Sequence, residues 1–298
     1  KLLTDAGKSV AVIRHPMPYG YLEMQRVQRL ASTEDLVSHE CTIEEREEYE
    51  PYVDMGIPIY AGVDYQGILD ESSREADIVL WDGGNNDFSF IKPDLDIVVV
   101  DALRAGHEID YFPGEVNFRR ADILVISKAG SAEPGALDGI RQRAAELNPE
   151  APLCTADLDI LVDEPERLQG QRVLVIEDGP TVTPGGMSFG AGSVAAERAG
   201  ATPVDPRPYA VGTIRDTFEA YPHMRRILPA MGYSEAQREA LAETINACCE
   251  AENVGCIVDA SPARLDLMLD LDVPLARVGY RFKQLDGPAL DELVRKLL

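Results

Sequence analysis

Short apolar runs rich in β-branched residues recur along the chain with helical stretches between them, and this alternation limits the fold more than any other feature. The runs lie at residues 9–13, 77–81, 96–100, 123–126, 172–176, 256–258 and 275–278. Such short continuous runs are typical of parallel strands that helices cover on both faces. Stretches with a helical pattern lie at residues 133–147, 192–198, 235–250, 264–269 and 288–298. The sequence therefore predicts an α/β fold with parallel sheets.

The division into domains follows from the length of the chain and from one loop-like segment. A chain of 298 residues is long enough for two domains. Residues 165–170 (PERLQG) precede the strand predicted at 172–176 and have the composition of a linker. We therefore predict a first domain over residues 1–168 and a second domain over residues 169–298.

The first residues look like the end of a helix. Lys1 is not a methionine, and residues 1–6 resemble a last helical turn that Gly7 ends. The pattern G-x-x-x-x-G-K-[ST], a phosphate-binding loop of NTPases, does not occur in the sequence. We expect that a structural segment precedes Lys1.

Charge and cysteine content narrow the functional classes. The 52 acidic residues outnumber the 28 basic ones, for a formal net charge of −24. This excess argues against nucleic-acid binding and against binding to anionic lipid, and no apolar run is long enough to span a membrane. The five cysteines include no C-x-x-C pair, so neither a disulfide framework nor a common zinc site is indicated. Together with the absence of a signal peptide, this predicts a cytoplasmic protein.

The basic residues are mostly arginine, since only 6 of the 28 are lysine. Scarce lysine with a large acidic excess suits a cytoplasm rich in salt, where self-repulsion is screened. A halophilic source and an ordinary acidic cytosolic protein are both consistent with this composition.

Ligands of parallel sheets bind at the carboxyl ends of the strands, so the residues that follow each run are candidates. Arg14 and His15 follow the first run, and Arg14 could grip a phosphate. Asp82 follows the second run and leads into Gly83, Gly84 and Asn85, where the carboxylate could hold Mg²⁺ and the glycines allow close approach of backbone to ligand. Structural turns are the alternative for both segments.

Two further strand ends carry charged residues. Arg104, His107 and Glu108 follow the third run and could supply charge stabilisation or proton transfer. Lys128 follows the fourth run, where the aliphatic part of its side chain could pack over the flat ring of a nucleotide base.

A glycine-rich segment over residues 178–192 separates the strand at 172–176 from the next helix. Its candidate anion-binding residues are Gly185, Gly186, Ser188, Gly190 and Gly192. Residues 190–195 match the dinucleotide pattern G-x-G-x-x-A, but the strand ends too far upstream for that motif. An anion-binding loop and a structural loop both stay open.

Taken together, the motifs resemble those of the cyclic 2,3-diphosphoglycerate synthetase family, which also contains proteins labelled predicted GTPases. The segments that carry the resemblance extend over nearly the whole chain: RHPMPYG (14–20), CTIEEREEYEP (41–51), AGVDY (61–65), WDGGNND (81–87), GHE (106–108), PGEVN (113–117), EDGPTVTPGGMSFGAG (177–192), VDPRPYAVGTI (204–214) and LPAMGYS (228–234). IVDASPARL (257–265) is a looser match.

The resemblance implies a P-loop NTPase core followed by a smaller Rossmann-like domain. The P-loop itself would lie just upstream of Lys1, so the core in this chain would lack it. Asp82 would take the place of the Walker B acid, with Gly83 and Gly84 near the γ-phosphate. Relatives carry N-K-x-D where this chain has Ser127 and Gly130 around Lys128. This departure favours ATP or relaxed base choice over guanine.

The function that the resemblance implies is Mg²⁺-dependent, NTP-driven phosphoryl chemistry, namely the ATP-driven closure of 2,3-diphosphoglycerate to its cyclic anhydride. The cofactor would be Mg²⁺, the co-substrate ATP or GTP, and the partner a small phosphorylated substrate. Without its P-loop the chain alone is expected to be inactive. A regulatory GTPase that acts on a protein partner and a non-catalytic anion-binding module are the alternatives, and a homodimer is possible.

Overall fold

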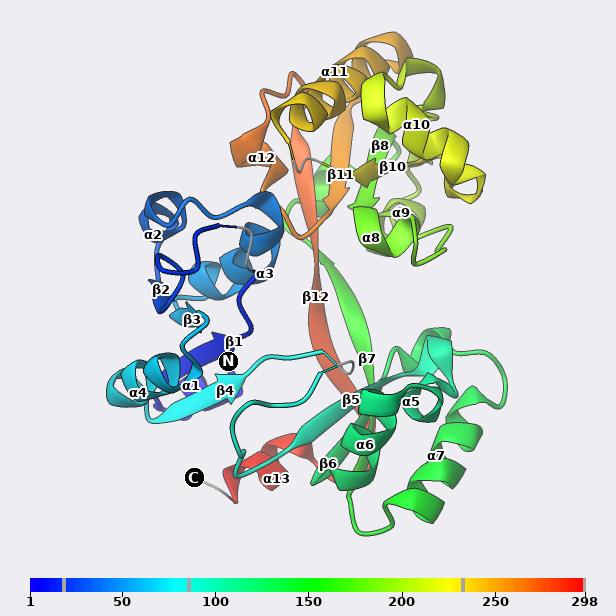
Figure 1. Cartoon of the computed structure of the whole chain (residues 1–298). Coiled ribbons are helices and arrows are strands. Elements are labelled where there is room, and N and C mark those ends of the chain that lie inside the picture. Colours follow the sequence, from blue (N-terminus) through cyan, green and yellow to red (C-terminus); the bar gives the residue numbers. More distant parts are fainter. Residues whose placement is uncertain (18–19, 85–86, 232–233, 297–298) are drawn as a thin grey trace. The chain divides into compact units, whose positions relative to one another are not determined.

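Figure 1 presents a computed structural model of the chain. The structure describes residues 1–17, 20–84, 87–231 and 234–296, and for residues 43 and 44 the backbone only. The chain folds into two compact units, which are described separately. Unit 1 comprises Lys1–His39, Tyr52–Asp159 and Phe282–Leu298, and unit 2 comprises Glu40–Pro51 and Ile160–Arg281.

The first sheet of unit 1 has the strand order β2-β3-β1-β4. Strand β1 pairs in parallel with β3 and β4, and β2 pairs antiparallel with β3. These strands are β1 (Val10–Arg14), β2 (Gln28–Leu30), β3 (Ile59–Ala61) and β4 (Ile78–Trp81), and the helices of this segment are α1 (Leu2–Asp5), α2 (Thr33–Ser38) and α4 (Tyr65–Glu75). Helix α3 (Ile43–Asp54) belongs to unit 2 as far as Pro51, and its last residues, from Tyr52, belong to unit 1. Ile13 and Trp81 are partners in the register of β1 and β4, so the residues that follow both strands lie side by side.

A second set of parallel strands in unit 1 has the order β7-β6-β5. It consists of β5 (Ile97–Asp101), β6 (Ile123–Ser127) and β7 (Leu153–Val162), with helical segments η1 (Ala102–Arg104), α5 (His107–Asp110), α6 (Phe112–Arg120), η2 (Ala129–Ser131), α7 (Ala136–Leu147) and α13 (Leu290–Arg295). Phe118 of α6 and Ile140 of α7 are fully buried against Leu124 and Ile126 of β6.

Unit 2 contains a sheet with the strand order β10-β8-β11-β12, and the short β9 also pairs with β8. The strands are β8 (Arg172–Asp178), β9 (Thr202–Pro203), β10 (Ile227–Ala230), β11 (Cys256–Ala260) and β12 (Leu275–Asp286), which runs on into unit 1. The helical segments are η3 (Pro165–Arg167), α8 (Gly179–Val182), α9 (Ala191–Arg198), η4 (Arg207–Tyr209), α10 (Gly212–Ala220), η5 (Pro222–Met224), α11 (Glu235–Glu252) and α12 (Leu265–Met268).

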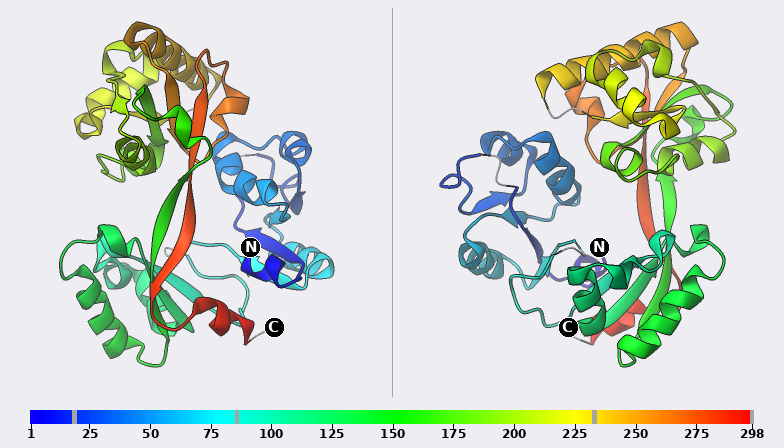
Figure 2. Two further views of the ribbon diagram at one scale, coloured as in Figure 1. Left: turned by 180° about the vertical axis from the view of Figure 1, so that it is seen from behind. Right: turned by 45° about the vertical axis from the view of Figure 1, so that its right-hand side comes forward.

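Helices cover both faces of the unit 2 sheet (Figures 1 and 2). Successive side chains of a strand point to opposite faces. Accordingly, Val173 and Val175 of β8 pack with Ala195 of α9, whereas Leu174 and Ile176 pack with residues of α10 and α11. This two-sided burial explains why the strand reads as a continuous apolar run.

Local capping fixes the ends of the longest helix, α11. The hydroxyl of Ser234 accepts a hydrogen bond from the backbone of Gln237 at 3.2 Å, and the Gln237 side chain accepts one from the backbone of Ser234 at 3.0 Å. This reciprocal capping satisfies amides that have no partner within the helix. At the other end, Asn253 adopts the left-handed conformation that ends many helices.

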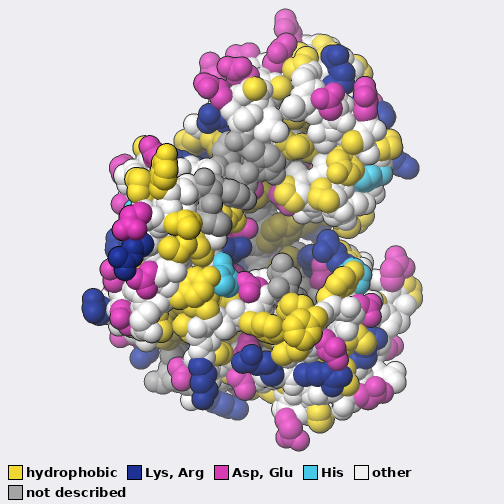
Figure 3. All heavy atoms as spheres, viewed as in Figure 1, with side chains coloured by type: hydrophobic (Ala, Val, Ile, Leu, Met, Phe, Trp, Pro, Cys, Tyr) yellow, Lys and Arg dark blue, Asp and Glu magenta, His cyan; other side chains and the backbone are white. Residues whose placement is uncertain are grey.

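The predicted α/β fold with parallel sheets is confirmed, whereas the assignments to a P-loop NTPase core and a Rossmann-like domain stay predictions. The predicted domain boundary after residue 168 also stays a prediction; the compact units place residues 160–168 with unit 2 and residues 282–298 with unit 1. No helix in the described part of the chain is both long and apolar enough to cross a membrane. Acidic side chains are spread over the surface on view in Figure 3, in keeping with the net charge.

Candidate functional site

The carboxyl ends of β1 and β4 bring together two residues predicted from the sequence, Arg14 and Asp82. Arg14 Nη1 lies 2.6 Å from Asp82 Oδ2, and the Tyr52 hydroxyl of α3 donates to the same oxygen at 2.7 Å. The backbone N–H of Asp82 donates to the Ile13 carbonyl at 2.9 Å. The second carboxylate oxygen, Oδ1, has no hydrogen-bond or ion-pair partner among the described residues, and the side chain is about one-third exposed. Asp82 is thus held in one orientation with an oxygen left over for a ligand.

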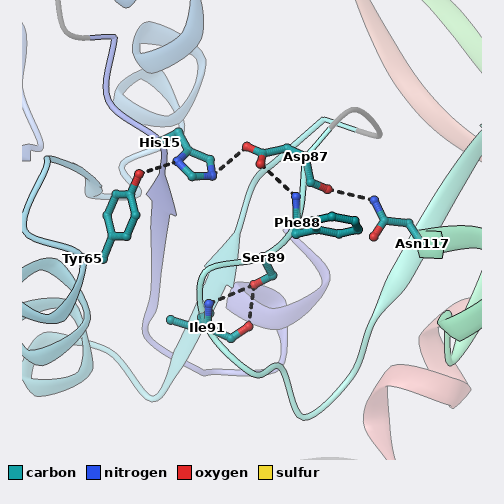
Figure 4. A network of polar contacts seen from close by, with 7 residues as sticks. All are labelled: His15, Tyr65, Asp87, Phe88, Ser89, Ile91 and Asn117. Carbon is teal, nitrogen blue, oxygen red and sulfur yellow. Dashed lines mark hydrogen bonds and ion pairs between the residues drawn. The ribbon is translucent and has the colours of Figure 1, made fainter. Parts of the chain in front are cut away.

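His15, the next predicted residue, lies in a polar network with residues that follow β3 and β4 (Figure 4). Its Nδ1 is 3.1 Å from the Tyr65 hydroxyl, and its Nε2 is 2.6 Å from Asp87 Oδ2. The Nε2 atom is buried and has no partner with hydrogen-bond geometry in the described chain. The backbone carbonyl of Asp87 accepts from Asn117 Nδ2 of α6 at 2.8 Å.

Gly83, the residue after Asp82, has a steric role. A Cβ atom at Gly83 would overlap the indole ring of Trp81, so no other residue fits there without movement. Gly83 and Gly84 line a cavity of about 1130 Å³, together with Trp81, Asp82 and Asn117. Asn85, the remaining predicted residue of this segment, lies outside the described residues.

The other predicted residues of unit 1 lie at the ends of β5 and β6. Asp101 accepts from Lys128 Nζ at 2.9 Å, while Arg104 Nε lies 4.0 Å from the same carboxylate. Glu108 is buried and pairs with Arg143, whose Nε is 2.6 Å away. His107 packs edge-on against Tyr111 with ring centroids 5.1 Å apart. A cavity of about 210 Å³ is lined by Asp101, Arg104, His107, Glu108 and Tyr111, among others.

In unit 2 the glycine-rich loop encloses a carboxylate of the chain itself. Glu177, at the end of β8, accepts hydrogen bonds from the backbone of Ser193 at 2.8 Å, the Ser193 hydroxyl at 2.9 Å and the backbone of Gly192 at 3.3 Å. A Cβ atom at Gly190 would overlap this carboxylate, which explains that glycine. Burial raises the pKa of Glu177, and the donors of α9 work against this rise.

The predicted anion-binding residues of this loop therefore differ in availability. The amide of Gly192 is engaged by Glu177, whereas Gly185, Gly186 and Ser188 are exposed. An external anion at the N-terminus of α9 would have to displace the Glu177 carboxylate.

A second buried acid of unit 2, Asp259 at the end of β11, was missed by the sequence analysis. Its Oδ1 accepts from the backbone of Ser261 at 3.0 Å and from the Ser261 hydroxyl at 2.6 Å. Its Oδ2 is buried and has no hydrogen-bond partner in the described residues. Burial raises the pKa of Asp259 to about 6, although Ser261 and Arg277 favour the charged form.

Tyr52, Tyr65 and Asn117 were missed as well, because each comes from a helix. Tyr65 and Asn117 do end the segments AGVDY and PGEVN, which carried the family resemblance. Asp87 and Asp259 lie in segments that carried the family resemblance, so their acidic character could have singled them out. No group of three or more His, Cys, Asp or Glu side chains able to hold a metal occurs in the residues that the structure describes. A magnesium ion bound here would therefore take at most two such side chains from the described residues and complete its shell with water or phosphate oxygens.

Comparisons with known proteins bear on the family. The chain is 50% identical over 297 residues to arginine synthetase ArcE of Thermococcus kodakarensis; the match covers 99% of this chain and 65% of that protein. It is 30% identical over 96 residues to cyclic 2,3-diphosphoglycerate synthetase of Pyrococcus furiosus, a match that covers 30% of this chain and 22% of that protein. No protein-family model matches. HypB of Helicobacter pylori, solved with nickel, superposes at a TM-score of 0.32 with 12% identity, over 52% of this chain and 68% of that one.

These comparisons correct the resemblance drawn from the motifs. Assignment to the cyclic 2,3-diphosphoglycerate synthetase family, and with it the closure of 2,3-diphosphoglycerate, is wrong, because the match of nearly full chain length is to a protein of another name and product. The motifs are spread over strand ends, loops and parts of helices such as α3 and α6. Such similarity reflects a shared scaffold and does not specify the substrate.

Proposed function

We propose that this chain is part of an enzyme that synthesises arginine with the help of a nucleotide. The observation that carries the proposal is 50% identity over 297 residues to a protein named arginine synthetase. The chain spans 65% of the length of that relative, so the proposal concerns the whole enzyme of which such a chain forms the larger part. Similarity of this extent to a synthetase favours an enzyme over a regulatory GTPase or a binding module.

The site that supports this function best lies at the carboxyl ends of β1 and β4. Asp82 has one oxygen engaged by Arg14 and Tyr52 and the other without a partner in the described chain. Such a carboxylate would hold Mg²⁺ directly or through water, and the ion would neutralise phosphate charge on a bound nucleotide. Arg14 would keep the carboxylate in place and add positive charge beside the nucleotide.

The chemistry of arginine fits acidic side chains close to such a site. A guanidinium group binds carboxylates through two parallel hydrogen bonds. Asp82 follows β4 and Asp101 ends β5, and each already pairs with a cation of the chain, Arg14 and Lys128 respectively. A bound arginine would have to share Asp101 with Lys128 or displace that lysine.

The test is arginine turnover by the purified protein. Amino-acid chromatography would follow arginine in the presence of Mg²⁺ with ATP, GTP, or ADP and phosphate, since a synthetase can be assayed in either direction. We expect a change in arginine that needs both nucleotide and Mg²⁺ and that EDTA abolishes. No nucleotide-dependent change of arginine in any of these mixtures would contradict the proposal.

A matched pair of variants tests the role of Asp82. Asp82→Asn keeps the shape and removes the charge, so we expect turnover to fall by at least about 100-fold, the effect of losing one essential electrostatic group. Asp138→Asn changes a carboxyl whose side chain is 86% exposed and serves as the control. If Asp82→Asn retained activity within a factor of about two, Asp82 would be only a turn residue, for which asparagine is equally suited.

A further inference from the structure

Strands β4 and β5 of unit 1 each have an edge with which no strand of the described residues pairs. Strand β4 pairs with β1 on one side, and β5 pairs with β6 on one side. The backbone N–H of Asp82 donates to the Ile13 carbonyl of β1, so by alternation that of Trp81 points to the open edge of β4. In β5 the Asp96 carbonyl accepts from β6, so the backbone of Ile97 points to the other edge.

Neither edge carries the features that protect exposed edges in proteins. Natural edge strands are blunted by lysine, proline or bulges, because an open edge pairs readily with another chain. Strand β4 consists of IVLW, and β5 begins with IVVV, which are compositions typical of interior strands. The composition of both strands therefore indicates that another strand covers these edges.

Apolar side chains on one face of these strands are exposed as well. Leu80 is 40% exposed, Ile97 39% and Val99 48%. The register partners of the two β5 residues in β6, Ile123 and Val125, point to the same face. Residues of α13 pack on Ile123 and Val125, which are buried, whereas the two β5 side chains stay exposed. The cover of this face thus ends at β6.

The open edges line one cavity. The cavity of about 1130 Å³ described above is lined by Leu80 of β4 and Ile97 of β5. Leu3 of α1 and Val294 of α13 also line it. Space between the two edges is therefore bounded by one helix on the side of β4 and by another on the side of β5.

Two sources of a covering strand can be compared. A second copy of this chain is a poor source, because its described strands are already paired within their own sheets and cannot enter between two edges. The longer relative offers another source, since the match covers 65% of that protein and about a third of its length lies outside. A strand with its helix and connection takes only about 30 residues.

We propose that the space between the two edges, here called the β4–β5 groove, binds one apolar β-strand from a part of the enzyme outside these 298 residues. The strand pairs with both edges, and a helix of the same part covers Leu80, Ile97 and Val99, as helices cover both faces of parallel sheets. Asp82 lines the same cavity, so the strand lies beside the carboxylate on which the proposed function depends. The source of the strand rests on the proposed function; the pairing is measurable without nucleotide or arginine.

Amide hydrogen exchange, read residue by residue, compares this chain with the intact longer relative. We expect the N–H groups of Trp81 and Ile97 to exchange quickly in this chain. At the matching positions of the relative they should exchange at least about 100-fold more slowly, because a strand accepts them. The N–H of Val12 donates to the Pro58 carbonyl at 2.9 Å and should be slow in both proteins, which makes it the internal reference.

Charged substitutions distinguish an open groove from a filled one. Ile97→Lys places its charge in water in this chain, so we expect a melting temperature within about 2 °C of the parent. The same substitution at the matching position of the relative should lower its melting temperature by at least about 5 °C, because the charge is then buried. Met55→Lys, at a side chain that is 55% exposed outside the groove, should be neutral in both. Val98→Lys, at a buried position of β5, should destabilise both.

Three results would overturn the inference. Slow exchange of Trp81 and Ile97 in this chain alone would mean that its edges are already covered, and sedimentation would show whether a second copy covers them. Fast exchange at the matching positions of the relative would mean that no strand enters. A relative that tolerates the lysine would mean that the face stays in water. Failure of the arginine assay would overturn the proposed function and leave these three results to decide the pairing.

Discussion

Asp259 makes the stability of unit 2 depend on pH. Burial raises the pKa of this carboxyl from 3.8 to about 6 in the folded chain. Below about pH 4 both the folded and the unfolded state carry the proton. As the pH rises, the unfolded state loses its proton first, so the free energy of unfolding falls until the folded state also ionises near pH 6.

The size of this loss follows from the pKa values. A difference of about two pKa units corresponds to about 3 kcal/mol, at 1.36 kcal/mol per unit. Asp259→Asn removes the charge and keeps an oxygen for the two hydrogen bonds from Ser261. The new amide nitrogen is buried without an acceptor, which costs about 1–3 kcal/mol at every pH. Only the charge depends on pH, so the variant should gain about 3 kcal/mol relative to the parent between pH 4 and 7.

Urea unfolding at several pH values measures this difference. Circular dichroism follows the unfolding of both units, whereas the fluorescence of Trp81 follows unit 1 only, because Trp81 lies in unit 1. A transition seen by circular dichroism but not by tryptophan fluorescence is therefore that of unit 2. Asp138→Asn, at an exposed carboxyl, should show no such trend. If the difference between Asp259→Asn and the parent stayed constant to within about 1 kcal/mol, near the error of the extrapolation, the raised pKa would be refuted.

Two further predictions concern Gly83 in unit 1 and Glu177 in unit 2. Gly83→Ala should destabilise unit 1 by about 1–3 kcal/mol and shift the Trp81 emission, because the new methyl group overlaps the indole ring; Gly279→Ala, where a Cβ atom meets nothing within 4 Å, should be neutral in the same thermal melts. Glu177→Ala should destabilise unit 2 by about 1–3 kcal/mol, since donors of α9 lose their acceptor. Sulfate should then stabilise this variant more than it stabilises the parent. Equal stabilisation of both by sulfate would mean that the N-terminal end of α9 does not bind anions.

The part of the site that the sequence predicts depends on regular geometry. Parallel strands end at the same edge, so residues that directly follow adjacent strands meet, as Arg14 and Asp82 do. Tyr52 and Tyr65 could not be assigned in this way, since a helical side chain reaches the strand end only if the helix packs at one particular rotation. Asp87 lies several residues beyond the end of β4, so its contact with His15 does not follow from the strand register.

The motifs could not predict the product of the reaction, for a related reason. The segments that carried the family resemblance include helical parts of α3 and α6 as well as strand ends. They indicate a shared scaffold, whereas the substrate is chosen by side chains that come from several elements. Likewise, the loop over residues 178–192 has the glycines of an anion site, yet it is Glu177 of the preceding strand that determines what those glycines surround.

The carboxylates at the strand ends differ between the two units, and this difference bears on which unit holds the reaction site. In unit 2, the carboxylate of Glu177 is engaged by the chain itself, and Asp259 is buried so deeply that its charge costs stability. In unit 1, Asp82 is partly exposed and has an oxygen without a partner among the described residues. A carboxylate that is oriented by two donors and still open to solvent is prepared for a ligand at little cost in reorganisation. If the proposed function is correct, we therefore expect nucleotide and arginine to bind at the strand ends of unit 1 and not at those of unit 2.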